Sequence, residues 1–376
     1  MMHQRGHTVF HYGHEDSEVE GTHITVLTNE DLLKSYGTYN WRREQFKHST
    51  DDHAHKTFNE KASIEISKLK RAGDFLLLFW GHGHSGVASA HKDLIVVEPG
   101  IGCFNRPVAP FCVYESYAVM HYVYGKFDLM PRFMDCVIPN YFDLDDFEVE
   151  KSPQELYGSY VGLSIELAEE SRFSFIKPGY VICISRLITS KGLQIAVEAC
   201  KLTGNKLIIA GQGSLEDCLA GHKDFFATSK EDFNSRPSVW HVGYIEPKER
   251  LALLQGAKCL MCPTLYAEPF GGVNVEAQLC GIPVVSTDWG AFSETVIHGT
   301  TGFRCRTMDH FVWALKNLSL LDPIKIKTIA RANYGLQKVA SMYEEYFSML
   351  QDVAHKNGFY TLNDGRLGLR WLEKVT

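Results

Sequence analysis

Two glutamates flank a pair of glycines in the segment YAEPFGGVNVEAQLCG (266–281). Glu268 precedes Gly271 and Gly272, and Glu276 follows within a stretch of helical spacing. A glycine-rich turn that leads into a helix suits a phosphate, because backbone N–H groups point out of the helix start. Carboxylates would repel that phosphate, so these two side chains must have another partner.

Two cations occupy a comparable place after the apolar segment YVICIS (180–185). Arg186 and Lys191 lie in the loop SRLITSKG, just ahead of a second helical stretch. Two cations can hold a diphosphate, and arginine offers a planar fork for bidentate contact. Ionised carboxylates only accept hydrogen bonds, whereas sugar hydroxyls donate them. We therefore expect the cations to bind a diphosphate, and Glu268 and Glu276 to bind hydroxyls of a sugar and a ribose.

Two further segments follow expected strands and would share this rim. The turn GQGS (211–214) has no side-chain bulk at Gly211 and Gly213, and Tyr244 could support an aromatic base. Each feature has a simpler interpretation: a solvated basic loop, an ordinary turn, an exposed loop acid at Glu268, or a helix-dipole role for Glu276. A capping box is excluded, because the residue three positions before Glu276 is valine.

Short apolar segments alternate with helical stretches from about residue 178 onward. Strands without polar residues are typical of a parallel sheet covered by helices on both faces. Ligands of such sheets bind beyond the carboxyl ends of the strands. The expected strands are 180–185, 206–211, 238–245, 258–263 and 282–287, and the expected helices are 193–204, 247–257 and 274–281.

The first half follows a similar but less regular α/β pattern. We place a domain boundary near Lys177 and Pro178, after a Glu-, Ser- and Gly-rich stretch at 145–177. The predicted domains are 1–177, 178–345 and a tail, 346–376, that could pack back on the first domain. The expected strands are 8–12, 23–28, 74–80, 93–99 and 134–140, and the expected helices are 57–73 and 341–353.

Composition narrows the class of protein. The 376 residues suit two domains, and 45% hydrophobic with 22% charged residues is typical of a globular chain. A net charge of -7 argues against a general nucleic-acid binder. The longest apolar run, FLLLFW, is far too short to cross a bilayer, and no signal peptide is visible. We expect a soluble, cytoplasmic protein whose ten cysteines stay reduced, with Cys259 and Cys262 in the core.

With these residues in place, the second half resembles the retaining glycosyltransferases of family 4, which have the GT-B fold. The similarity covers roughly 180–305 through ISRLITSKGLQIAVEA, LIIAGQGSLED, VGYI, YAEPFGGVNVEAQLCGIPVVSTDWGAFSETV and GTTGF. In the first half, VIPNYFDLDDF (137–147) resembles the family's interdomain signature, with Tyr141 where glycine is usual. RGHTVFHYG (5–13) resembles the end of its first helix and its second strand.

The resemblance implies an α/β GT-B fold, with two Rossmann-like doubly wound domains facing each other across a cleft. It implies a nucleotide-sugar donor held mainly by the second domain, without a cofactor or a catalytic metal. The catalytic residues would be Arg186 and Lys191 on the diphosphate and Glu268 on the sugar. The expected donor-binding residues are Gly213, Tyr244, Phe270, Gly271, Gly272, Val273 and Glu276.

Two departures from the family pattern concern the first half. The family usually has a strand and a glycine-rich loop ahead of the RGH segment, so we expect this piece to be missing where Met1 stands just before it. A histidine often follows the strand that corresponds to DLIVVEP, and here Glu98 holds that place. His82 and His84 are the substitutes to consider. The alternatives are structural or exposed histidines, or a metal site shared with His91.

The sequence thus predicts a retaining, metal-independent transferase that moves a hexose to a glycan, protein or lipid acceptor. GDP-mannose is the first donor to consider and UDP-glucose the second. A homodimer is one option for its assembly. The alternatives are a sugar-nucleotide epimerase of the same fold and a binding protein without turnover. A dinucleotide-dependent dehydrogenase is disfavoured, because no strand leads into GxGxxG with an acid about 20 residues on. The acidic cluster DLDD (143–146) is expected to be solvated surface.

Overall fold

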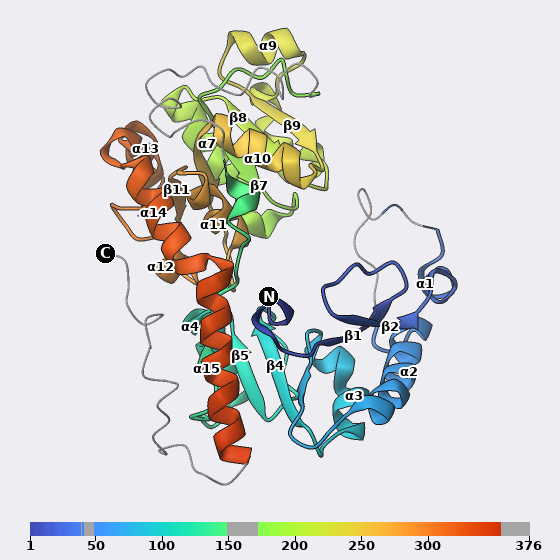
Figure 1. Ribbon diagram of the computed structural model, residues 1–376. Helices are drawn as coiled ribbons and strands as arrows, with labels where there is room; N and C mark the ends of the chain where they lie inside the picture. Colours follow the sequence, from blue (N-terminus) through green and yellow to red (C-terminus); the bar gives the residue numbers. More distant parts are fainter. Residues whose placement is uncertain (39, 41–48, 149–171, 355–376) are drawn as a thin grey trace. The chain divides into compact units, whose positions relative to one another are not determined.

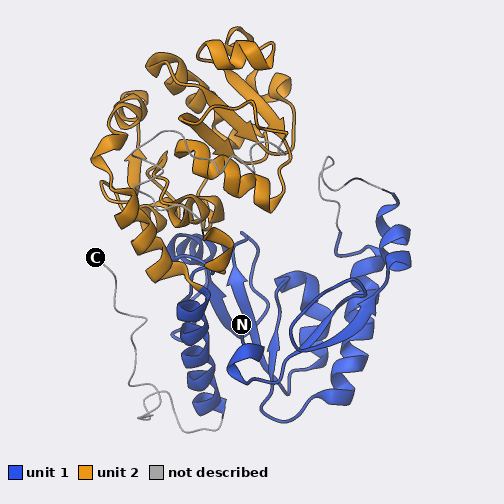
Figure 2. Ribbon diagram, turned by 45° about the horizontal axis from the view of Figure 1, so that its top comes forward, with its two compact units in different colours: residues 1–141, 336–374 blue, residues 142–335, 375–376 orange. Residues whose placement is uncertain are grey.

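The computed structural model describes residues 1–38, 40, 49–148 and 172–354 (Figure 1). The described residues form two compact units, one within 1–141 and 336–354 and one within 142–335 (Figure 2). The second unit begins well ahead of the expected boundary at Lys177, because Phe142 pairs with Gly335, and Phe173 and Ile176 pack into the core of that unit. Most of the stretch 145–177 lies outside the described residues.

The second unit is built on a parallel six-stranded sheet in the order β12-β11-β10-β7-β8-β9. In sequence order, β7, β8 and β9 extend the sheet in one direction, and β10, β11 and β12 extend it in the opposite direction. The strand order therefore reverses between the neighbours β7 and β10. This is the doubly wound arrangement expected from the sequence. The strands are β7 (Tyr180–Ile184), β8 (Leu207–Ala210), β9 (Val239–Gly243), β10 (Ala257–Cys262), β11 (Val284–Thr287) and β12 (Gly302–Cys305).

Side chains alternate between the two faces of this sheet, and each face has its own core. Val181 and Cys183 of β7 pack with α7 and α13, whereas Tyr180 and Ile182 pack with α10 and α11. The apolar strands are therefore buried on both sides. The helices are α7 (Leu193–Thr203), α8 (Leu215–Leu219), α9 (Lys230–Ser235), α10 (Pro247–Gly256), α11 (Gly272–Leu279), α12 (Phe292–Thr295), α13 (Met308–Lys316) and α14 (Pro323–Tyr334).

Local sequence explains where these helices begin and end. The helix α10 starts at Pro247, with a reciprocal capping box between Glu246 and Glu249. The helix α7 ends at Gly204, whose left-handed conformation (φ 67°) lets the cap N–H bond back to the last turn. The loop carrying Arg186 and Lys191 joins β7 to α7, and its short 3-10 turn, Thr189–Lys191, ends at Gly192, the N-cap residue of α7.

The first unit contains a parallel four-stranded sheet, β3-β4-β5-β6, and a separate parallel pair, β1-β2. Its strands are β1 (Phe10–His14), β2 (Thr22–Leu27), β3 (Phe75–Leu77), β4 (Ile95–Ile101), β5 (Phe111–Tyr114) and β6 (Cys136–Val137). Its helices are α1 (Asn29–Tyr36), α2 (His53–Leu69), α3 (Ser85–Ala90), α4 (Tyr117–Phe127) and α15 (Leu336–Ala354).

The helix α15 belongs to the first unit although it follows the second unit in sequence (Figures 1 and 2). Its residues Val339, Tyr346 and Leu350 are buried against Ile95 and Val97 of β4. Arg5, near the N-terminus, forms an ion pair with Glu344 of the same helix. Residues 355–376 of the predicted tail lie outside the described residues.

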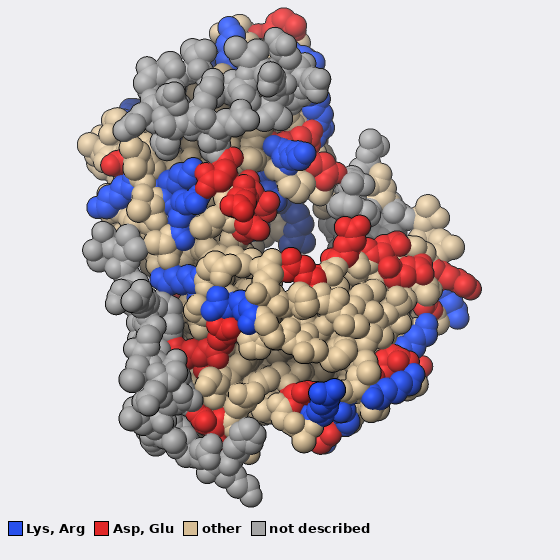
Figure 3. Space-filling model, viewed as in Figure 1, with Lys and Arg blue, Asp and Glu red and all other residues tan. Residues whose placement is uncertain are grey.

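The distribution of surface charge and the state of the cysteines agree with what the composition predicts. On the face shown in Figure 3, acidic and basic side chains are interspersed and do not gather into one basic surface. All ten cysteines are free, and Cys259 and Cys262 pack into the cores on opposite faces of the sheet. The acids Asp143, Asp145 and Asp146 are exposed, as expected for solvated surface. Within the described part of the chain, no helix has both the length and the apolar composition that crossing a membrane requires.

Candidate active site

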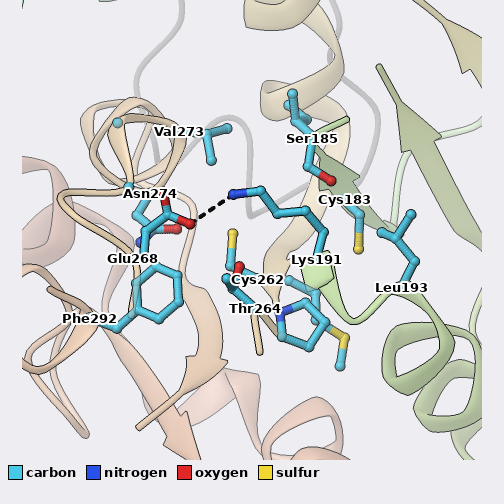
Figure 4. Close-up of a pocket in the computed structure, with 15 residues that line it drawn as sticks. Cys183, Ser185, Lys191, Leu193, Cys262, Thr264, Glu268, Val273, Asn274 and Phe292 are labelled. Atoms are coloured by element: carbon cyan, nitrogen blue, oxygen red, sulfur yellow. Dashed lines mark hydrogen bonds and ion pairs between the residues drawn. The ribbon is translucent and has the colours of Figure 1, made fainter. Parts of the chain in front are cut away.

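A pocket opens at the carboxyl ends of β7 and β10, where the strand order of the second unit reverses (Figure 4). Ligands of doubly wound sheets bind at this switch point, because the loops on either side of it turn away in opposite directions. The pocket is lined from the two strand ends and from the start of α11. The lining residues are Cys183, Ile184, Ser185, Lys191, Leu193, Met261, Cys262, Pro263, Thr264, Glu268, Gly271, Gly272, Val273, Asn274 and Phe292.

Lys191 and Glu268 form an ion pair in this pocket. The Nζ of Lys191 donates to Oε2 of Glu268 over 2.7 Å, and the two side chains are only 17% and 15% exposed (Figure 4). They lie 77 residues apart in sequence and meet because β7 and β10 are neighbours. The structure thus brings together the predicted diphosphate-binding cation and the predicted sugar-binding carboxylate.

The surroundings of Lys191 keep it charged. Burial by itself lowers the pKa of the Lys191 ammonium, but the charge and the hydrogen bond of Glu268 raise that pKa, and Tyr266 contributes in the same direction, so the pKa lies above its usual value. The ammonium also lies 4.8 Å from the centre of the Tyr266 ring, a distance suited to a cation–π contact. A permanent positive charge is therefore fixed beside the start of α11.

The start of α11 carries no side-chain cap. Its N-cap residue, Gly271, has left-handed backbone angles (φ 78°, ψ 58°) and, as glycine, offers no side chain to cap the first turn. The first N–H groups of a helix have no partner within the helix. Because Gly271, Gly272 and Val273 line the pocket, these N–H groups and the positive end of the helix are available to an anion bound there.

Glycine at position 271 is required by its conformation and by its neighbours. A Cβ atom there would lie 2.7 Å from Nδ2 of Asn274 and 3.0 Å from Phe292. We expect Gly271→Ala to combine about 1 kcal/mol of left-handed strain with about 1–3 kcal/mol for overpacking. Urea unfolding measures the loss, and calorimetry against a nucleoside diphosphate should show weaker binding.

The matched control is Gly299→Ala. Gly299 has a similar angle, φ 74°, but a Cβ atom there would have no other atom within 4 Å. This variant should therefore carry the strain without the clash. Equal losses of unfolding free energy in the two variants would contradict the assignment of close packing around Gly271.

Three predicted residues lie on the same rim without lining the pocket. Arg186 follows β7, is exposed, and makes no ion pair with a described residue. Gly213 follows β8 in a left-handed turn (φ 127°), and a Cβ there would lie 2.6 Å from that of Leu187, so glycine allows the loops after β7 and β8 to approach. Tyr244 follows β9, and its carbonyl accepts a hydrogen bond from Arg172.

Phe270 and Glu276 are also outside the pocket. The ring of Phe270 is buried against α14, so only its backbone is available to a ligand. One carboxylate oxygen of Glu276 lies 3.1 Å from Nε of Arg250, in an ion pair that lacks hydrogen-bond geometry. Burial raises the pKa of Glu276, and Arg250 partly offsets this. Glu276 lies beyond the first turn of α11, so a role at the helix dipole does not explain it. Ribose binding by Glu276 stays a prediction.

Several pocket residues were not predicted from the sequence. Ser185 directly follows β7, and Thr264 lies two residues after the end of β10, so their place after predicted strands was a usable signal. In the sequence, nothing distinguishes Phe292 from other aromatic residues of a core, so its place in the pocket could not be predicted. Asn274 is fully buried in the first turn of α11, and only a polar side chain between two valines marks it in the sequence.

His82, His84 and His91 do not come together as a metal site in the part of the chain that the structure describes. The ring of His84 stacks on Phe58, and burial, with His55 nearby, lowers the pKa of His84 to about 4. His91 is buried and bonds to the backbone of Ser63. No group of three potential ligand side chains that could hold a metal ion occurs among the residues that the structure describes. His84 is thus a neutral residue that packs against Phe58. His82 is engaged elsewhere, because its Nδ1 lies 3.3 Å from Nδ2 of Asn105.

The doubly wound parallel sheet and the similarity to solved glycosyltransferase structures define the class of protein: an α/β protein with the GT-B glycosyltransferase fold. Residues 166–333, a span that lies within the second unit, match the family model described as "Glycosyl transferases group 1". Glycogen synthase of Mycobacterium tuberculosis is 33% identical over 165 residues, which are 41% of this chain and 37% of that protein. The chain therefore matches well under half the length of this curated relative.

Solved structures extend the fold similarity to both units. Sucrose-phosphate synthase from Thermosynechococcus elongatus gives a TM-score of 0.61 at 16% identity, over 94% of this chain and 91% of that one. Anabaena Alr3699/HepE in complex with UDP-glucose gives a TM-score of 0.59 at 17% identity, over 78% of this chain and 82% of that one. At these identities, the comparison establishes the fold alone.

Proposed function

We propose that the chain is a glycosyltransferase that moves a hexose from a nucleoside diphosphate sugar to an acceptor hydroxyl, with retention and without a metal. One observation carries the proposal: Lys191, Glu268 and the uncapped start of α11 line a single pocket at the switch point of the sheet. This arrangement of a cation and backbone N–H donors beside a carboxylate supports binding of a diphosphate and a sugar in one pocket. The group 1 match over residues 166–333 supports the same class of reaction.

The diphosphate would bind between Lys191 and the first N–H groups of α11. The exposed Arg186, on the same rim, can reach a diphosphate from outside the pocket. As the bond from the sugar to the diphosphate breaks, negative charge grows on the leaving group. Fixed positive charge stabilises that state more than the ground state and so accelerates the reaction.

Glu268 would accept hydrogen bonds from the hydroxyls of the transferred sugar. In the structure this carboxylate is paired with Lys191, so a diphosphate that draws Lys191 away also frees Glu268 for the sugar. Binding of the two halves of the donor is then coupled through one ion pair. Tyr244 and Glu276 remain the predicted contacts of the base and the ribose.

Retention follows if the acceptor attacks from the face that the diphosphate leaves. The C1–O bond to the diphosphate breaks, the C1–O bond to the acceptor forms, and the acceptor proton passes to the departing phosphate oxygen. The leaving group then acts as the base. No protein nucleophile is needed, and Glu268 serves to hold the sugar.

Calorimetry against nucleotide sugars, with a chelator present, tests this function. GDP-mannose and UDP-glucose are the two donors to measure first, each beside its bare nucleoside diphosphate. Product analysis should then show release of nucleoside diphosphate and a glycosylated acceptor. An epimerised donor formed without acceptor would favour an epimerase. Tight binding without release of nucleoside diphosphate, for any acceptor tried, would favour a binding protein.

A further inference from the structure

Asn274 lines the pocket with a buried carboxamide that finds no hydrogen-bond partner among the residues that the structure describes. Its residue is 0% exposed, and neither Nδ2 nor Oδ1 bonds to any described residue. It lines the same pocket as Lys191 and Glu268, and its side chain lies next to that of Glu268 (Figure 4). Buried polar groups are almost always paired, so an amide with both ends unpaired needs an explanation.

A second buried amide on the same helix shows the contrast. Gln278 lies one turn further along α11, is 1% exposed, and donates from Nε2 to the carbonyl of Thr295 over 2.9 Å. The side-chain amide of Gln278 therefore contributes a hydrogen bond to the fold, whereas that of Asn274 forms none with the described residues. Exchanging the Nδ2 and Oδ1 assignments of Asn274 would not alter this, because neither atom has a partner among the described residues.

The missing partner must both donate and accept hydrogen bonds. The amide Oδ1 needs a donor, and the amide Nδ2 needs an acceptor. An ionised phosphate offers acceptors only, so it would leave Oδ1 unpaired. A hydroxyl offers both, and the neighbouring carboxylate of Glu268 also needs donors. The wall formed by these two side chains therefore suits a sugar with adjacent hydroxyls.

We infer that Asn274 binds a hydroxyl of the donor sugar, next to a hydroxyl that binds Glu268, and thereby contributes to the choice of sugar. This inference rests on the proposed function. Because Asn274 is closed to solvent, the hydroxyl reaches it only when a neighbouring side chain moves. The release of Glu268 from Lys191 on diphosphate binding provides that movement. Asn274 thus forms a hydrogen bond with the sugar and makes no contact with the diphosphate.

The test compares Asn274→Leu with Gln278→Leu. Leucine has nearly the shape of asparagine, so N274L removes an unpaired amide and should keep or raise the midpoint of thermal unfolding, whereas Q278L should lower it. N274L should bind the bare nucleoside diphosphate as the wild type does. Its affinity for the nucleotide sugar should fall about tenfold, as expected for a lost hydrogen bond in a buried site.

Deoxy donors provide a second arm of the test. One donor lacking a single sugar hydroxyl should bind the wild type more weakly, and N274L should not distinguish it from the full donor. Equal affinity of wild type and N274L for the nucleotide sugar would overturn the inference and indicate a buried water. An equal loss for nucleotide sugar and bare diphosphate would also overturn it. If the wild type binds no nucleotide sugar, the proposed function fails as well.

Discussion

Lys191→Met is expected to reduce kcat/KM for transfer by about 10²- to 10³-fold, the range for loss of one preorganised group that stabilises developing negative charge. Methionine keeps an apolar stem of similar length, so the pocket wall is preserved while the charge is lost. The variant also leaves Glu268, 15% exposed, without its cation. Affinity for the bare nucleoside diphosphate should fall too. Steady-state kinetics and calorimetry measure the two effects.

Lys201→Met is the matched control for this variant. Lys201 is also paired, through a bond of 2.9 Å to Asp224, but it lies at the end of α7 and does not line the pocket. Surface pairs of this kind contribute little, so kcat/KM should stay close to the wild-type value. Wild-type turnover by the Lys191 variant would show that this cation does not hold the leaving group.

Glu268→Gln is expected to reduce transfer by about 10- to 100-fold, the range for a hydrogen bond to a charged group. Glutamine has the same shape but a neutral amide, so it accepts more weakly from sugar hydroxyls. The bare nucleoside diphosphate should bind as tightly as before or more tightly, because Lys191 no longer has a carboxylate partner. Transfer should thus fall while the affinity for the bare nucleoside diphosphate does not.

Glu249→Gln controls for the loss of a carboxylate elsewhere in the unit. Glu249 pairs with Arg172 over 2.8 Å and lies outside the pocket, so its substitution should change neither transfer nor nucleotide binding. If Glu268→Gln weakened binding of the bare diphosphate as much as it slowed transfer, the carboxylate would be acting on the diphosphate half of the donor, contrary to the proposed role.

The sequence predicted the parts of the fold that depend on local pattern. The segment YVICIS forms β7 at Tyr180–Ile184, and PKERLALLQGA forms α10 at Pro247–Gly256, because apolar runs and caps act within a few residues. The doubly wound sheet follows from such alternation. That Lys191 and Glu268 lie at the same edge of the sheet could also be predicted, since both follow strands of one parallel sheet.

Features that depend on distant packing were not predictable in this way. The short strands β5 and β12 are four residues long and have no alternation that separates them from loops. The ion pair between Lys191 and Glu268 requires that β7 and β10 be neighbours, although β8 and β9 lie between them in sequence. The burial of Asn274 and the early start of the second unit at Phe142 also arise from contacts across many residues.

The central claim is that a fixed cation and the leading N–H groups of α11 hold a diphosphate, which leaves the carboxylate to the sugar. A crystal structure with bound nucleotide sugar tests it most directly. We expect the diphosphate within hydrogen-bond distance of Lys191 and of the backbone at 272–273, with Glu268 released toward the hexose. A diphosphate bound away from these groups, with the pair of Lys191 and Glu268 intact, would contradict the claim.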